Sequence, residues 1–283
     1  MSPPASEATV EAPAGASPGS SPAGKLRTRV RIGHAWIDAL TFDEAVLEIE
    51  RLIETGKGGS VFTPNVDHLV QLEREENAPF REAYGDASLC LVDGQPLLWA
   101  SHLLGSPLPE KVSGSDLIVP LVARAEKKRW RVYMIGGAPG IGALAAEKLQ
   151  DQFDVEIVGI EAPHVTKSGE PVEGQAVIDR MAHARPHLVF VAFGAPKQEL
   201  FIRRALPAIG PAVAVGVGAG FDFIAGKMRR APRWMSDGGL EWLFRLAQEP
   251  RRLAKRYLLD DPRVVSILYR TLRVPKSERI KQV

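Results

Sequence analysis

Asp93 is the clearest candidate for proton-transfer chemistry in this sequence. It follows the apolar run SLCLV and precedes Gly94, so we expect it at the carboxyl end of a strand. A carboxylate there could accept a proton from a substrate hydroxyl. The same residue could also cap the helix expected from PLLWASHLL, and the two roles are compatible.

Other polar side chains follow two further apolar runs. Thr63 and Asn65 could form hydrogen bonds to a sugar or a base, or could simply form the turn. The segment GAPKQE places Lys197, Gln198 and Glu199 at the start of an expected helix, where backbone N–H groups suit a phosphate or a hydroxyl-rich ligand. The helix dipole disfavours a cation at this end, so Lys197 suggests a ligand more than a structural role.

Two glycine-rich turns complete the set of candidate ligand contacts. GGAPGIG contains Gly136 and Gly137 but does not fit G-x-G-x-x-G, and it suits a tight strand-to-helix turn as well as a diphosphate contact. VGVGAGFDF contains Gly218 and Asp222 and leads into a basic run. No P-loop, metal-ligand spacing or G-x-S-x-G motif is present.

These residues are embedded in an alternation of short apolar runs and helical segments, which predicts an α/β fold with a largely parallel, Rossmann-like sheet and flanking helices. Ligands of such folds bind beyond the carboxyl ends of the strands, so we expect the candidate turns on one rim. The expected strands lie within residues 28–37, 59–65, 88–94, 130–137, 155–160, 187–194 and 212–220. Thr41-x-x-Glu44 predicts a capping box at the start of the first helix.

The charge distribution divides the chain. Residues 227–283 hold 15 Lys and Arg against 6 Asp and Glu, a net charge of +9, whereas the whole chain carries +2. We predict a disordered tail at 1–27, a catalytic domain at 28–226 and a basic, helical, amphipathic appendage at 227–283. The appendage could bind an anionic membrane surface, close over the active site, or pack on the domain with its cations in solvent. The single cysteine, Cys90, is expected in the core.

The motifs resemble those of the WecG/TagA/CpsF family, glycosyltransferase family 26. The resemblance extends from about Arg31 to Leu259 and rests on Thr63-Pro64-Asn65, Asp93-Gly94, GSDL, GGAPG, GAPKQE, GVGAGFDFIAGKMRRAP and GLEWLFRLAQEPRR. It implies an inverting hexosyl- or N-acetylhexosaminyltransferase that moves a sugar from a UDP-sugar to a polyprenyl-diphosphate-linked glycan in cell-surface polysaccharide synthesis.

The resemblance also implies roles for individual residues. Asp93 matches the general base, and Thr63, Asn65 and Gln198 match polar pocket residues. Two positions depart from the family pattern: Lys111 and Lys255 stand where arginine is usual, which keeps the charge but loses bidentate geometry. A third departure is GIEAPHV at 159–165, a turn near the expected donor pocket that could recognise a different sugar. The appendage cations expected near the phosphates are Arg230, Arg245, Arg252 and Lys255.

On this interpretation, the turn glycines let the backbone approach the nucleotide, and Asp222 orients the turn or a donor hydroxyl. Alternatively, Asp222 simply caps the turn. We expect no cofactor and no required metal ion, with arginines stabilising the diphosphate charge. Expected partners are the UDP-sugar, the lipid-linked acceptor, the cytoplasmic face of the plasma membrane and a possible second copy of the chain, but no nucleic acid. The alternative function is an NAD-dependent oxidoreductase that uses GGAPGIG.

Overall fold

The computed structural model describes residues 26–232, 234–235, 238–248, 250–255 and 260–283. Nearly all of the predicted tail, residues 1–27, therefore lies outside the described residues. The division into a domain at 28–226 and an appendage at 227–283 stays a prediction.

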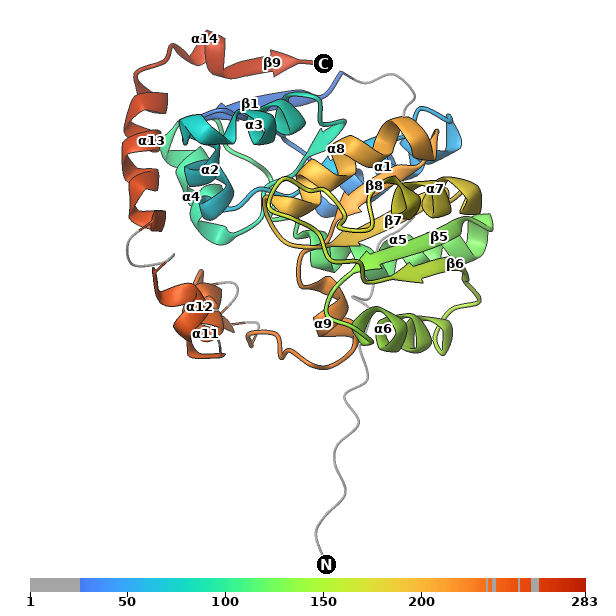
Figure 1. Cartoon of the computed structure of the whole chain (residues 1–283). Coiled ribbons are helices and arrows are strands. Elements are labelled where there is room, and N and C mark those ends of the chain that lie inside the picture. The colour runs from blue at the N-terminus through green and yellow to red at the C-terminus, as the bar shows by residue number, and fades with distance from the viewer. Residues whose placement is uncertain (1–25, 233, 236–237, 249, 256–259) are drawn as a thin grey trace, which may run out of the picture.

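A six-stranded parallel sheet forms the centre of the molecule (Figure 1), with strand order β4-β3-β8-β7-β5-β6. The register pairs Phe62 of β3 with Cys90 of β4, and Val191 of β7 with Gly216 of β8. The predicted Rossmann-like α/β fold is confirmed. The strands are β3 (Gly59–Phe62), β4 (Leu89–Cys90), β5 (Arg131–Gly136), β6 (Glu156–Glu161), β7 (Leu188–Ala192) and β8 (Val213–Gly216).

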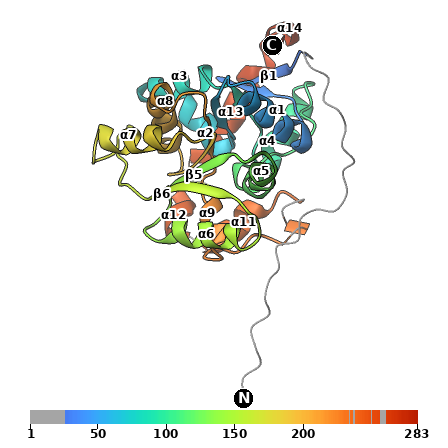
Figure 2. The same cartoon turned by 90° about the vertical axis from the view of Figure 1, so that its right-hand side faces the viewer.

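Helices cover both faces of this sheet, and Figure 2 shows α7 and α8 on one side of the strands and α1 and α5 on the other. Alternation along β5 explains the two layers, because Val132 and Met134 enter one apolar cluster while Tyr133 and Ile135 enter the other. The helices of the domain are α1 (Phe42–Glu54), α2 (Val66–Leu72), η1 (Glu75–Asn77), α3 (Ala78–Gly85), α4 (Gln95–Leu103), α5 (Gly114–Lys128), α6 (Ile141–Gln150), α7 (Gln175–Ala184), α8 (Lys197–Ile209) and α9 (Gly220–Ile224).

The local sequence accounts for the start of α1. Thr41 caps α1, and its side chain and that of Glu44 form the reciprocal capping box expected from T-x-x-E. Cys90 is fully buried, as predicted, and burial raises the pKa of its thiol far above the ordinary value.

A second, antiparallel sheet has the order β2-β1-β9. The apolar run at 28–37 was expected to form a strand, and it forms a hairpin of β1 (Thr28–Ile32) and β2 (Ala35–Asp38) that turns at Gly33. β9 (Ile280–Gln282) was not predicted; it pairs with β1, Val30 opposite Ile280. The C-terminal end of the chain therefore returns to the first described strand.

The segment between α9 and β9 passes α11 and α12 and then runs along α13 (Figure 1). Its elements are α11 (Glu241–Gln248), α12 (Pro250–Lys255), η3 (Asp261–Arg263), α13 (Val264–Leu272) and α14 (Lys276–Arg279). No described helix is long and apolar enough to cross a bilayer.

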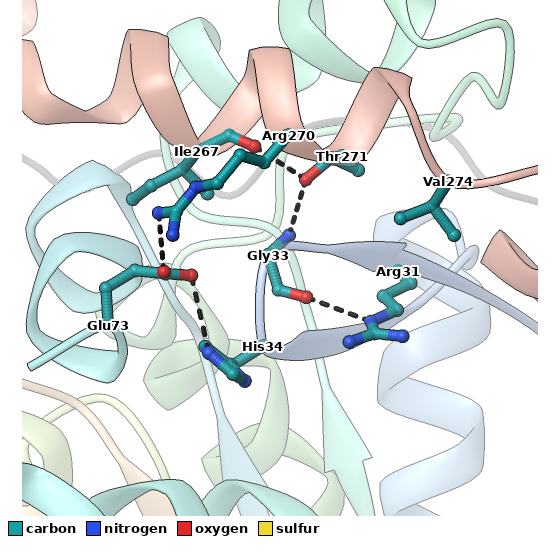
Figure 3. Close-up of a pocket in the computed structure, with 8 residues that line it drawn as sticks. All are labelled: Arg31, Gly33, His34, Glu73, Ile267, Arg270, Thr271 and Val274. Carbon is teal, nitrogen blue, oxygen red and sulfur yellow. Dashed lines mark hydrogen bonds and ion pairs between the residues drawn. The ribbon is translucent and has the colours of Figure 1, made fainter. Parts of the chain in front are cut away.

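Polar contacts attach α13 to the hairpin and to the end of α2 around a small cavity of about 140 Å³ (Figure 3). The Gly33 N–H donates to Thr271 Oγ1 at 3.0 Å, and Arg270 Nη2 lies 2.6 Å from Glu73 Oε2. Gly33 has a φ of +58°, and a Cβ there would lie 2.8 Å from Ile267 Cγ2. The backbone of the hairpin turn thus packs directly on α13.

We predict that Gly33→Ala destabilises the protein in two ways. It forces a side chain into the left-handed region, and it pushes α13 away from the hairpin. Gly56→Ala is the matched control, because Gly56 has a φ of +65° but no neighbouring atom within 4 Å of its Cβ position. Urea unfolding should show a loss about 1–3 kcal/mol larger for Gly33→Ala than for the control. Equal losses would show that the contact with Ile267 contributes nothing.

Candidate active site

The predicted site residues lie at the carboxyl ends of five neighbouring strands. In sheet order, Asp93 follows β4, Thr63 and Asn65 follow β3, Gly218 follows β8, Lys197 to Glu199 follow β7, and Gly136 ends β5. Parallel pairing brings these ends to one edge of the sheet. The expected common rim is present, and the ligand contacts of its residues stay predictions.

Asp93 is held at the junction of β4 and β3. Its N–H donates to Pro64 O at 2.9 Å, which ties the two strand ends together. Burial, reinforced by the charge of Glu241, raises the pKa of the Asp93 carboxyl to about 6, although Lys111 and Arg245 oppose the shift. The carboxylate is therefore a stronger base than an ordinary aspartate. Gly94 is the N-cap residue of α4 and no side chain caps that helix, so the expected capping role is not observed.

Cations from two parts of the chain act electrostatically on Asp93. Lys111 Nζ lies 3.3 Å from Glu241 Oε2 at the start of α11. Burial lowers the pKa of Lys111, but the carboxylates of Glu241 and Asp93 outweigh it and the pKa is raised. The Arg245 Nε atom is buried and has no hydrogen-bond partner among the described residues. Helix α11 of the appendage thus supplies a cation and an anion to the electrostatic environment of Asp93.

The other appendage residues differ in placement. Arg230 pairs with Asp116 and lies 5.0 Å from the Phe223 ring centre, so it is attached to the start of α5 and to α9. The side chains of Arg252 and Lys255 lie outside the described residues. Their predicted phosphate contacts stay predictions.

Thr63 and Asn65 both take part in local packing. Thr63 is buried, and a Cβ on Gly114 would lie 3.0 Å from Thr63 Oγ1 and 2.2 Å from Gly216 O. Only glycine permits α5 to begin this close to β3 and β8. Asn65 caps α2, with His68 completing the capping box. The expected turn-forming role of Asn65 is confirmed, and its contact with a sugar or a base stays a prediction.

Gln198 connects the ends of β7 and β8. Its Oε1 accepts from the Gly218 N–H at 3.1 Å, and its Nε2 donates to Glu199 Oε1 at 2.9 Å. Lys197 has a structural partner, because its Nζ donates to Val165 O at 2.9 Å. The unfavourable helix-dipole position of Lys197 is thus compensated by a contact with the segment that follows β6.

The glycine-rich turn GGAPG serves tight packing. A Cβ on Gly136 would lie 2.7 Å from the Ala192 carbonyl, and the Gly137 N–H donates to Ala192 O at 2.8 Å. GGAPG therefore closes β5 against β7, as the strand-to-helix interpretation predicts. Asp222 lies in α9, and its carbonyl accepts from Lys227 N at 2.9 Å, so its backbone starts the turn into the basic run.

Sequence reasoning missed Glu241 and His68. His68 stands three residues after Asn65, the capping-box position, and that spacing is a usable signal. Glu241 lies 130 residues from Lys111 in sequence, and no local pattern connects them. Among the described residues, no group of three His, Cys, Asp or Glu side chains is arranged to hold a metal ion.

Residues 30–278 match the Glycosyl transferase WecG/TagA/CpsF family. The chain belongs to this family. It is also 33% identical over 215 residues to an N-acetylglucosaminyldiphosphoundecaprenol N-acetyl-beta-D-mannosaminyltransferase of Bacillus spizizenii, across 76% of this chain and 80% of the relative. The WecG/TagA/CpsF resemblance is confirmed, and this glycosyltransferase membership does not favour the oxidoreductase alternative.

The raised pKa of Asp93 predicts a stability effect of Asp93→Asn. Ionising this half-buried carboxyl, whose pKa rises from 3.8 to about 6, disfavours the folded state increasingly as the pH rises from about 4 to about 6. The variant avoids that cost. Between about pH 4 and about pH 8, the free energy of unfolding of Asp93→Asn should rise by about 1–2 kcal/mol relative to that of wild type. This figure is reduced for partial solvent screening.

Urea unfolding at the two pH values measures this difference. Asp154→Asn is the control, because the Asp154 side chain is 81% exposed and lies in a surface pair with Arg129. A relative loss of stability for Asp93→Asn at the higher pH would contradict the buried-charge argument.

Proposed function

We propose that this glycosyltransferase moves an N-acetylhexosamine, with N-acetylmannosamine as the expected sugar, from a UDP-sugar to a polyprenyl-diphosphate-linked N-acetylglucosamine with inversion. The observation that carries the proposal is the Asp93 carboxyl on the rim, with a pKa of about 6 and cations of both the domain and the appendage acting on it. The name of the Bacillus relative supports the acceptor and the sugar.

Asp93 would act as the general base. Its carboxylate takes the proton of the acceptor hydroxyl while that oxygen bonds to the anomeric carbon, and UDP leaves from the opposite face of the sugar. One base and one leaving group suffice for a single displacement with inversion. The raised pKa favours proton abstraction, yet leaves the group mostly ionised at neutral pH.

Lys111 and Arg245 would stabilise the charge that develops on the departing diphosphate. Both act electrostatically on Asp93, and Arg245 Nε has no hydrogen-bond partner among the described residues. Cations placed where charge develops lower the barrier most. We propose that they, together with appendage arginines, make a bound metal unnecessary.

The segment 159–165 would help select the donor sugar. A Cβ on Gly159 would lie 2.1 Å from the Tyr133 ring, so the segment begins packed on β5. At its other end Val165 O accepts from Lys197, at the start of α8 on the rim. A change of sequence in segment 159–165 would therefore alter the packing next to Gln198.

The test is transfer to a soluble polyprenyl-diphosphate N-acetylglucosamine analogue from a panel of donors: UDP-N-acetylmannosamine, UDP-N-acetylglucosamine, UDP-glucose and UDP-N-acetylmannosaminuronic acid. We expect the first to be used best. For wild type, kcat/KM should fall as the pH drops below about 6, because the base becomes protonated. Asp93→Asn should lower kcat by about 10²–10⁴-fold.

Asp154→Asn again serves as the control and should turn over like wild type, because its side chain is exposed on the surface. Near-normal transfer by Asp93→Asn would remove Asp93 as the base. Transfer from none of the UDP-sugars by the wild-type enzyme would overturn the proposed reaction.

We also propose that the enzyme docks peripherally on the cytoplasmic face of the plasma membrane. Exposed apolar side chains occur on α4 and on the adjoining appendage, where Gly239 packs against the Trp99 ring. A lipid-linked acceptor must be reached from the membrane surface, and apolar side chains beside a basic segment suit an anionic interface. The exposed side chains are Trp99, Leu103, Trp234, Leu240, Trp242 and Leu243.

Replacing Leu103 and Leu243 with glutamate should weaken membrane binding, because each change removes an insertable apolar group and adds repulsion from anionic lipid. Co-sedimentation with vesicles of phosphatidylglycerol and phosphatidylethanolamine should show at least tenfold weaker binding. Val172→Glu is the control, since Val172 is an exposed apolar residue outside this surface. Equal binding by the double variant and wild type would contradict the docking surface.

A further inference from the structure

A buried chain of polar side chains runs beneath the carboxyl ends of β3, β8 and β7. Its centre is Glu199, whose side chain is fully buried in the first turn of α8. His68 and Gln198, on either side, are only 7% and 5% exposed. These three side chains come from two helices that follow different strands of the sheet.

Both sides of the chain meet at one oxygen of Glu199. Gln198 Nε2 donates to Glu199 Oε1 at 2.9 Å, and His68 Nε2 lies 3.5 Å from the same oxygen. On one side of Glu199, His68 Nδ1 lies 2.7 Å from Asn65 Oδ1. On the other side, Gln198 Oε1 accepts from the Gly218 N–H at 3.1 Å. The contacts therefore link a residue after β3 to a residue after β8.

The orientation of Gln198 follows from these contacts. The Gly218 N–H can only donate, so it requires the amide oxygen of Gln198. The amide nitrogen is then directed to Glu199, and an ionised carboxylate can only accept. A Cβ on Gly216 would lie 2.9 Å from Gln198 Nε2, so the amide also packs directly against β8.

The orientation of Asn65 follows by the same logic. The His68 backbone N–H donates to Asn65 Oδ1 in the capping box of α2. Nδ1 of His68 lies 2.7 Å from Asn65 Oδ1 and 3.2 Å from the Asn65 backbone nitrogen. An imidazolium donates from Nδ1 to Asn65 Oδ1 and presents its Nε2–H to Glu199 Oε1. The Glu199 carboxylate therefore favours the form of His68 that holds Asn65.

Burial of Glu199 needs a reason beyond helix stability. A glutamate in the first turn would benefit from the helix dipole equally well in solvent, without desolvation. Here it is fully buried, and its Oε2 atom has no hydrogen-bond partner among the described residues. Such an arrangement sacrifices stability and occurs where a fixed geometry is needed.

We propose that Glu199 and His68 are positioning residues for the glycosyl transfer. The pair holds Asn65 and, through Gln198, the turn at Gly218 in one arrangement across three neighbouring strand ends. Neither residue needs to touch the substrate. This inference rests on the proposed function, since it assigns the reacting sugar to that rim.

Glu199→Gln is the first test, because it keeps the shape and removes the charge. The introduced amide could present its own NH₂ group to Gln198 or His68, so the neighbouring amides lose their fixed orientation. We expect kcat to fall about 10–100-fold, with a smaller change in the donor KM, as positioning losses do. The pH profile should keep its fall below about 6, because Asp93 is unchanged.

A second measurement does not depend on the reaction. Hydrogen exchange of the Gly218 amide, followed by NMR, should be faster in Glu199→Gln, since its acceptor Gln198 is no longer held. Glu147→Gln is the matched control, an exposed glutamate on α6 whose change should leave both kcat and the exchange rate as in wild type. If Glu199→Gln does not fold, His68→Gln provides the same two measurements from the other member of the pair.

Rescue distinguishes positioning from simple stability. In the double variant His68→Gln and Glu199→Gln, a neutral amide pair replaces the charged one, and we expect kcat to recover at least partly relative to Glu199→Gln. Wild-type kcat and wild-type Gly218 exchange in the folded single variants would overturn the proposal. A wild-type enzyme without transfer activity would instead count against the proposed function, and the exchange result would still test the network.

Discussion

Parallel pairing of β4, β3, β8, β7 and β5 is the constraint on which the site depends. Since the strands run in the same direction, every turn that leaves their carboxyl ends emerges at one edge of the sheet. The packing at that edge is tight enough to require glycine, as at Gly114 against Gly216 and at Gly136 against Ala192. Polar residues from five separate stretches of sequence are thereby placed on a single surface.

Two carboxylates at this edge of the sheet have different environments. Asp93 is half-buried, and its pKa rises to about 6 despite the nearby cations, so it is suited to exchanging a proton. Glu199 is fully buried and receives a hydrogen bond from Gln198, which suits a fixed acceptor. The environment of each side chain, rather than its chemical type, separates a proton-transfer role from a positioning role.

The C-terminal segment is attached to the rest of the protein at several points. Near the rim, Glu241 pairs with Lys111. Farther along, Arg270 pairs with Glu73 after α2 and Thr271 contacts the hairpin turn, and β9 completes the small sheet beside β1. A cation of this segment, Arg245, acts on Asp93 from outside the sheet. The appendage is consequently part of the electrostatics of the site, whatever its contribution to membrane binding.

The local sequence was sufficient for features whose cause is local: apolar alternation indicated the α/β fold, T-x-x-E predicted the start of α1, and an apolar run placed Asp93 at a strand end. Family motifs extended this to the kind of reaction. Only the tertiary structure decided which residues interact, because the pairs Lys111 with Glu241 and His68 with Glu199 join segments 130 and 131 residues apart. Such contacts arise from the packing of whole elements and leave no periodic signal in the chain. The pKa of Asp93 depends on the same packing, because burial and distant charges set it.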